Sequence, residues 1–93
     1  MIMSFQGKVT YKIWNGELSL DVPIKIQNIA RRKLRMLHNS SSLQDISIPP
    51  ANRLEKLHGD YLGFYSIRIN SQWRIIFQWM NGNAYYVEII DYH

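Results

Sequence analysis

The fold is decided by residues 65–90, which read YSIRINSQWRIIFQWMNGNAYYVEII. In residues 65–69 and again in residues 73–79, large apolar side chains alternate with other residues, which is the period of a half-buried strand. Asn81-Gly82 is the dipeptide preferred in tight two-residue hairpin turns. We therefore expect three consecutive antiparallel strands, the last of them over residues 85–90.

Upstream of these strands the apolar residues follow the period of a helix. A helix over residues 24–39 is predicted by the three- and four-residue steps that separate Ile26, Ile29, Ala30, Leu34 and Leu37. Asp21-Val22-Pro23 predicts its start, because Asp is a good N-cap and Pro is tolerated in the first helical turn. A weaker helical stretch is expected at residues 8–14, and a single helical turn at residues 43–48 before Pro49-Pro50.

The remaining segments complete an α+β fold. Residues 1–5 are expected to form a short strand and residues 53–57 another, followed by a turn at His58-Gly59-Asp60. The prediction is an N-terminal short strand and two helices packed on a mostly antiparallel, twisted sheet. A length of 93 residues leaves room for one domain, over residues 1–93.

The composition restricts the function classes. Eleven Lys and Arg against seven Asp and Glu give a net charge of +4, which favours a polyanionic partner, nucleic acid before an anionic membrane. The sequence has no cysteine, no apolar run of membrane-spanning length and no signal-peptide pattern, so we expect a cytoplasmic protein without a membrane partner. Since His38, His58 and His93 lack metal-ligand spacing and no Gly-rich phosphate loop occurs, no metal or cofactor is expected.

Two arginines are the first candidates for chemistry. If residues 70–72 form the turn, Arg68 lies opposite Arg74 and both project from one face of the sheet. Like charges directly across a ladder are unfavourable, and a phosphate bound by both guanidinium groups would relieve the repulsion. The alternative is that each arginine is solvated or pairs with Glu88 or Asp91, and a two-residue turn would place the two on opposite faces.

The last residues of the sequence are the second candidates. In either register of the Asn81-Gly82 hairpin, Trp73 pairs near Ile90 or Asp91, so Tyr92-His93 extends to the edge of the Arg74 surface. Imidazole is the usual proton donor or acceptor at neutral pH. The alternative is a frayed tail whose histidine has no role.

Further charged residues have weaker claims. Glu55, Lys56 and His58 offer a carboxylate, an ammonium and an imidazole, but strand alternation places Glu55 and Lys56 on opposite faces. The helix residues Arg31, Arg32 and Arg35 could contact a nucleic-acid backbone, although a solvated face is the better interpretation.

Three stretches resemble a known family. NRLEKLHGD (residues 52–60), YSIRINSQWRIIF (65–77) and VEIIDYH (87–93) resemble the HigB toxins, including the GraT type, of the RelE/ParE superfamily, and the resemblance covers about residues 43–93. It implies an endoribonuclease that cleaves mRNA in the ribosomal decoding site. It also implies a helix-turn-helix antitoxin of the HigA type, through which alone the toxin would meet operator DNA.

The resemblance also implies roles for single residues. Arg74 matches the family's phosphate-contacting arginine, Tyr92 and His93 its terminal pair, and Asp91 the acid before them. Arg68 matches a basic position only loosely. His58 stands where some members have Lys and Glu55 where some have His, so the identity of the general base stays open. The candidate contacts to RNA and ribosome are the basic residues Arg31, Arg32, Arg35, Arg53 and Lys56.

These residues suit RNA cleavage without a metal ion. The 2′-OH of RNA can attack the adjacent phosphodiester, and fixed guanidinium groups stabilise the charge that develops on the phosphoryl oxygens. The hypothesis places Arg74 on the phosphate with Arg68 in support, His93 as the acid for the leaving 5′ oxygen, and Tyr92 positioning the base or the phosphate. The alternatives are a ParE-like gyrase inhibitor, marked by DNA damage with intact mRNA, and a non-catalytic ribosome- or RNA-binding module.

Overall fold

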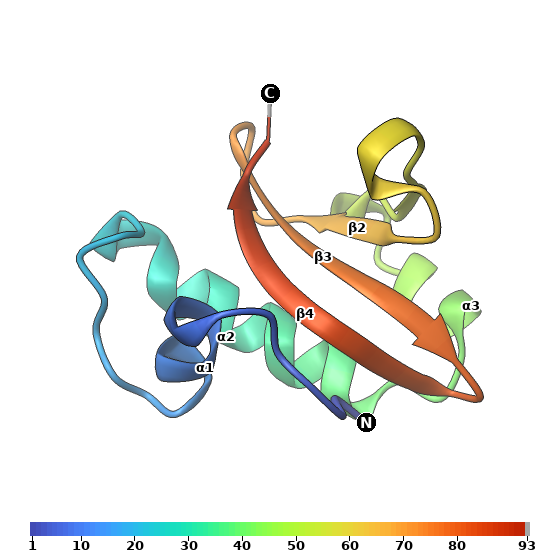
Figure 1. Cartoon of the computed structure of the whole chain (residues 1–93), viewed down its shortest axis with the longest axis horizontal. Coiled ribbons are helices and arrows are strands. Elements are labelled where there is room, and N and C mark those ends of the chain that lie inside the picture. Colours follow the sequence, from blue (N-terminus) through green and yellow to red (C-terminus); the bar gives the residue numbers. More distant parts are fainter. Residues whose placement is uncertain (93) are drawn as a thin grey trace.

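The computed structural model describes residues 1–92 and has a helical layer and a sheet layer (Figure 1). Within these residues three α-helices come first, α1 (Lys8–Trp14), α2 (Ile24–Asn39) and α3 (Leu43–Ser47). The strands β1 (Glu55–Lys56), β2 (Tyr65–Arg68), β3 (Trp73–Met80) and β4 (Asn83–Asp91) follow. They form an antiparallel sheet in the order β1-β2-β3-β4, so the expected α+β class is confirmed.

One core lies between α1, α2 and the sheet. Every second residue of β2 and β3 packs into it, including Ile67, Ile75 and Phe77, which confirms the alternation expected from the sequence. From α2 the core receives Ile26, Ala30, Leu34 and Leu37. Burying a whole Ile or Leu side chain stabilises the fold by about 1.5–3 kcal/mol. The apolar face of α2 therefore determines how the helix packs on the sheet.

Helix α2 has the expected bounds, but its N-terminal cap differs from the expectation. The helix begins at Ile24 with Pro23 in the cap position, and no side chain caps it, so the prediction of Asp21 as N-cap was wrong. The buried Gln27 orders the preceding loop instead. Its Nε2 donates to the carbonyl oxygens of Ser19 (2.6 Å) and Val22 (2.7 Å), and its Oε1 accepts from the Ser19 N–H (3.2 Å).

The two hairpins have the expected register. Asn81 and Gly82 both have positive φ, 52° and 78°, as a type I′ turn requires, and β4 therefore starts two residues before the expected position. Residues 70–72 form the other turn, in which Asn70 Oδ1 accepts from the N–H groups of Gln72 (2.9 Å) and Trp73 (2.7 Å). This turn places Arg68 opposite Arg74 and confirms the prediction that they share a face.

The N-terminal segment lies along the free edge of β4 (Figure 1). It forms two isolated parallel bridges, Ile2 to Ala84 and Phe5 to Val87, rather than the continuous short strand that we expected. A β-bulge in β4 explains the interruption, because Tyr86 is an extra residue with φ 53° and its N–H donates to Ser4 Oγ (2.8 Å) instead of a backbone carbonyl.

The first strand is shorter than expected. Pro50–Asn52 forms a 3₁₀ turn and Arg53 has φ 46°, so only Glu55 and Lys56 pair with β2 in place of the whole of residues 53–57. The turn after β1 forms as expected and contains a second 3₁₀ segment, Gly59–Tyr61. Within residues 1–92 no helix has the length and apolarity needed to cross a bilayer.

Candidate active site

Arg74 is the centre of the candidate site. It projects from β3 on the sheet face that points away from the helices, since its neighbour Ile75 packs into the core. Its side chain is only 14% exposed, which is low for an arginine on an outer face. Neighbouring residues therefore cover most of this side chain.

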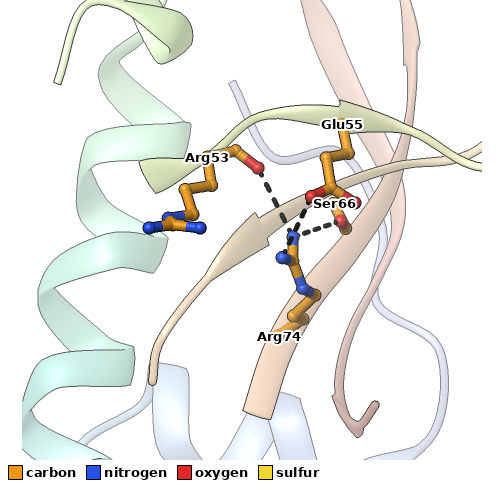
Figure 2. A network of polar contacts seen from close by, with 4 residues as sticks. All are labelled: Arg53, Glu55, Ser66 and Arg74. Carbon is orange, nitrogen blue, oxygen red and sulfur yellow. Dashed lines mark hydrogen bonds and ion pairs between the residues drawn. The ribbon is translucent and has the colours of Figure 1, made fainter. Parts of the chain in front are cut away.

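Three neighbours hold this guanidinium group (Figure 2). Nη2 forms an ion pair with Glu55 Oε1 at 3.2 Å. Nη1 donates to Ser66 Oγ at 2.9 Å and, at 3.4 Å, to the carbonyl oxygen of Arg53. The alternative offered by the sequence was that each arginine is solvated or pairs with Glu88 or Asp91; the ion pair that Arg74 forms with Glu55 was not among those options.

The pairing of β1 with β2 explains these contacts. Glu55 lies opposite Ser66, and Ser66 opposite Ile76, so Glu55 and Ser66 share the outer face with Arg74. The left-handed conformation of Arg53 turns the chain just before β1, which brings its carbonyl oxygen to Arg74. Glu55 is 49% exposed, so the ion pair borders on solvent and an approaching substrate can reach it.

The end of β4 passes beside Arg74. Trp73 pairs with Asp91, as expected, and the Tyr92 N–H donates to the Gln72 carbonyl oxygen at 2.8 Å. The Tyr92 ring centroid lies 5.5 Å from Arg74 Cζ, within the range of a cation–π contact. Asp91 Oδ2 accepts from Gln72 Nε2 at 3.0 Å and so secures the end of the strand. His93 lies outside the described residues.

A second carboxylate lies on the same face. Glu88 pairs with Ile76, two residues before Ile90, which is opposite Arg74. Desolvation by burial raises the pKa of Glu88 above its ordinary value of 4.5, because removing water disfavours the charged form.

Arg68 has different surroundings, although it lies directly opposite Arg74. Together with Arg32, Lys33 and Arg53 it lines an open hollow of about 490 Å³ between α2 and the end of β2. The two arginines therefore have different neighbours: the guanidinium group of Arg74 contacts Glu55 and Ser66, whereas Arg68 borders the hollow.

Five further candidate residues lie apart from Arg74. His58 is exposed at the start of the Gly59–Tyr61 turn, and within residues 1–92 no hydrogen bond or ion pair joins its side chain to Glu55 or Arg74. Lys56 is exposed on the face opposite to Glu55, as alternation predicted.

The arginines of α2 have different surroundings from one another. Arg31 is half-buried and donates through Nε to the Ile13 carbonyl oxygen (2.8 Å), so it joins α2 to α1 and is not a solvated residue. Arg32 and Arg35 are exposed, as expected.

Two residues that matter here were not singled out in the sequence. Ser66 had a detectable signal, because it is a small polar residue two positions before Arg68 in a strand and so shares the face of Arg74. Asn52 had no detectable signal in the sequence, although it is fully buried in the structure. Its Nδ2 donates to the Ile46 carbonyl oxygen (2.9 Å) and its Oδ1 accepts from Lys33 Nζ, which fixes the turn before β1 to both α2 and α3.

The arrangement suits the binding and polarisation of a phosphate. A guanidinium group held in one orientation loses little entropy when it binds an anion, and a carboxylate close by can accept a proton. In the described part of the chain no group of three or more His, Asp or Glu residues is placed to hold a metal ion.

Comparisons with known sequences identify relatives of this chain. Residues 3–93 match the family described as RelE-like toxin of type II toxin-antitoxin system HigB. Toxin HigB-1 of Vibrio cholerae is 46% identical over 63 residues, which are 68% of this chain and 66% of that protein. Endoribonuclease HigB of Proteus vulgaris is 29% identical over 93 residues, the full length of both chains.

Solved structures share the fold. A YafQ mutant from E. coli superposes with a TM-score of 0.65 at 13% identity and covers 98% of this chain and 91% of its own. The YoeB dimer from Staphylococcus aureus gives a TM-score of 0.55 at 23% identity, with 99% and 94% covered. The match over residues 3–93 shows that this chain belongs to the HigB family of RelE-like toxins of type II toxin-antitoxin systems.

Proposed function

We propose that this chain is an endoribonuclease toxin that cuts messenger RNA on the ribosome, with no metal ion in the chemical step. The proposal draws support from family membership and from the name of the Proteus vulgaris relative. A net charge of +4 suits an RNA substrate. The observation that carries the proposal is the guanidinium group of Arg74, held between Glu55 and Ser66 and contacted by the ring of Tyr92.

The reaction proceeds by attack of the RNA on itself. The 2′ oxygen bonds to the adjacent phosphorus, the bond from phosphorus to the 5′ oxygen breaks, and a 2′,3′-cyclic phosphate and a 5′-OH result. One proton leaves the 2′-OH and another reaches the 5′ oxygen. Negative charge grows on the phosphoryl oxygens in the transition state, and a fixed guanidinium group that meets it stabilises this state more than the ground state.

Arg74 contacts the phosphoryl oxygens in this scheme. Glu55 takes the proton from the 2′-OH, since its carboxylate lies 3.2 Å from Arg74 and therefore close to any phosphate bound there. His93 protonates the 5′ oxygen, because the preceding residue, Tyr92, lies against Arg74. Tyr92 positions the phosphate or a base, and Asp91 positions the end of the chain through Gln72.

The partners follow from the family and from the substrate. The neutralising partner is a helix-turn-helix antitoxin of the HigA type, and contact with operator DNA occurs only through it. The ribosome presents the message, and exposed basic residues such as Arg32 and Arg35 contact RNA. The place of action is the cytoplasm, where ribosomes and messages are.

The test is cleavage of a defined message by the purified protein with purified ribosomes. Arg74→Ala should lower the rate by about 10²–10³-fold, the effect of removing one donor to the transition-state oxygens, and removal of Tyr92-His93 should lower it comparably. Lys25→Ala removes the same charge from an exposed position on α2 and serves as the control. The upstream product should carry a 2′,3′-cyclic phosphate.

Several outcomes would contradict the proposal. Wild-type rates in both variants would remove Arg74 and the chain end from the chemistry. Products with a 5′-phosphate would indicate attack by water. Stable ribosome binding with intact message would favour a non-catalytic module, and DNA breaks with intact message would favour a gyrase inhibitor.

A further inference from the structure

The hollow beside α2 is lined by cations. Arg32 and Lys33 come from α2, Arg53 from the turn before β1, and Arg68 from the end of β2 (Figure 2 shows Arg53 next to the helix). Of the described residues that line it, none is acidic. We call these four residues and the space between them the basic hollow.

Such a cluster is unfavourable for the isolated protein. Two unit charges about 4 Å apart repel by roughly 1 kcal/mol in water and by more where water is partly excluded. In the basic hollow Arg68 and Lys33 are half-buried, while Arg32 and Arg53 are exposed. A bound anion relieves this repulsion, and arginine can bind phosphate oxygens through two parallel hydrogen bonds.

Lys33 has a fixed position in this cluster. Its Nζ donates to Oδ1 of the buried Asn52, which links α2 to the turn before β1. This contact holds one wall of the basic hollow in place. Arg32, Arg53 and Arg68 are therefore the side chains that can reorient toward a ligand.

Arg53 connects the basic hollow with the candidate active site. Its carbonyl oxygen accepts from Arg74 Nη1 at 3.4 Å, whereas its guanidinium group points away from Arg74 toward α2 (Figure 2). Arg53 therefore contacts Arg74 through its main chain and lines the basic hollow with its side chain. A strand whose scissile phosphate lies on Arg74 passes Arg53 when it continues toward α2.

We propose that the basic hollow is a second phosphate subsite, which binds a neighbouring phosphodiester of the RNA strand whose scissile phosphate lies on Arg74. The inference rests on the proposed function, because it takes the strand to be the substrate. It assigns Arg68 to binding of the strand and not to the reacting phosphate. The residues that contact the strand there are Arg32, Arg53 and Arg68.

The experiment measures binding without cleavage. A short, fluorescently labelled RNA in which every 2′-OH is methylated keeps all phosphates but cannot be cut. Its affinity for the intact protein is followed by fluorescence anisotropy at several salt concentrations. Each of Arg32→Gln, Arg53→Gln and Arg68→Gln should weaken binding several-fold and reduce the slope of log K against log salt by about 0.7, the value for one phosphate contact on a single strand.

Two comparisons make the result specific. Lys25→Gln, which removes a charge from α2 away from the basic hollow, should keep the wild-type slope, and Arg32→Lys should restore most of the loss because the charge is retained. A thermal melt of each variant identifies any variant that loses RNA affinity because it no longer folds. At such a position the Arg→Lys variant replaces the Arg→Gln variant, and its salt slope is compared with that of wild type.

The outcomes separate this inference from the proposed function. If Arg32→Gln, Arg53→Gln and Arg68→Gln all had the same salt slope as Lys25→Gln, the subsite would be overturned. The subsite would also be overturned if these variants bound RNA with wild-type affinity but no longer bound the antitoxin. If the variants lose RNA affinity while wild-type protein cuts no message on ribosomes, the basic hollow binds RNA phosphates, but the bound strand is not a substrate and the proposed function falls.

Discussion

Arg68 and Arg74 lie directly opposite each other on neighbouring strands, yet their surroundings differ. Arg74 contacts a carboxylate, a hydroxyl, a carbonyl oxygen and an aromatic ring. Arg68 borders a hollow that it shares with three other cations. Strand pairing gives both arginines the same face, and a third segment, residues 51–55, makes them different.

The difference suggests a division of labour. A guanidinium group held by several contacts is suited to the reacting phosphate, where orientation affects the rate. A guanidinium group among other cations is suited to a phosphate that only has to be bound, where charge matters more than orientation. Single substitutions can change the features on which this contrast depends.

The largest effect is expected for Glu55, the carboxylate that distinguishes the two environments. Glu55→Gln keeps the shape and one acceptor for Arg74 but cannot take a proton, so message cleavage should fall by about 10²–10⁴-fold. Affinity for the 2′-O-methylated RNA should rise, because a negative charge next to Arg74 is removed. Glu17→Gln, an exposed position in the loop after α1, is the control.

The split between rate and affinity is the decisive readout. If Glu55 only orients Arg74, the rate should fall less than about tenfold and Glu55→Asp should not restore it. If Glu55→Gln raised both affinity and rate, the carboxylate would hinder the substrate and would not be the base.

Conservative exchange of the two arginines is expected to give unequal losses. Arg74→Lys should lower cleavage by about 10²-fold, because a single ammonium cannot contact Glu55, Ser66 and a phosphate together. Arg68→Lys keeps the charge of the basic hollow and should cost at most a few-fold in RNA affinity. Cleavage rates of both variants are measured at saturating and at limiting ribosome concentrations, and RNA affinity is measured by anisotropy. Equal losses in the two variants would remove the proposed contrast.

Much of this arrangement could be predicted from local patterns. The alternation in β2 and β3, the turn at residues 70–72 and the Asn81-Gly82 hairpin determine the register, and the register alone places Arg68, Arg74 and Tyr92. Helix α2 likewise has the bounds that its apolar spacing predicts, Ile24–Asn39. These features depend on contacts between residues that are close in the sequence or joined by short turns.

The contacts around Arg74 depend on interactions that are distant in the sequence. The sequence gives Glu55 only a weak claim to the site, because nothing in residues 53–57 shows that Arg53 adopts a left-handed conformation. That conformation follows a turn held by the buried Asn52, whose partners lie on α2 and α3. Similarly, the bulge at Tyr86, which interrupts the pairing of residues 1–5, becomes visible only with the Ser4 hydroxyl next to it.

Asn52 should therefore affect both arginines together. Asn52→Ala leaves the Ile46 carbonyl oxygen and Lys33 Nζ without this partner, which should lower the free energy of unfolding by about 1–3 kcal/mol. At temperatures where the variant is folded, both cleavage and the salt slope of RNA binding should decrease. Thermal melts and the two assays on Asn52→Ala and on the exposed Gln44→Ala give the comparison. A stable variant with both properties intact would show that residues 51–55 do not need this anchor.

The smallest effect concerns Glu88, a second carboxylate on the face of Arg74, whose pKa is raised above 4.5 by burial. Between the unfolded and the folded pKa the native state binds more protons than the unfolded state, so the free energy of unfolding falls as pH rises through this interval. Glu88→Gln removes the penalty, and its Tm should exceed that of wild type by a few degrees at most near pH 7 and match it in acid below pH 4.5. Glu17→Gln should show no such divergence. If Glu88→Gln instead destabilised the protein at neutral pH, the charged carboxylate would stabilise the fold, which would contradict a net penalty from its burial.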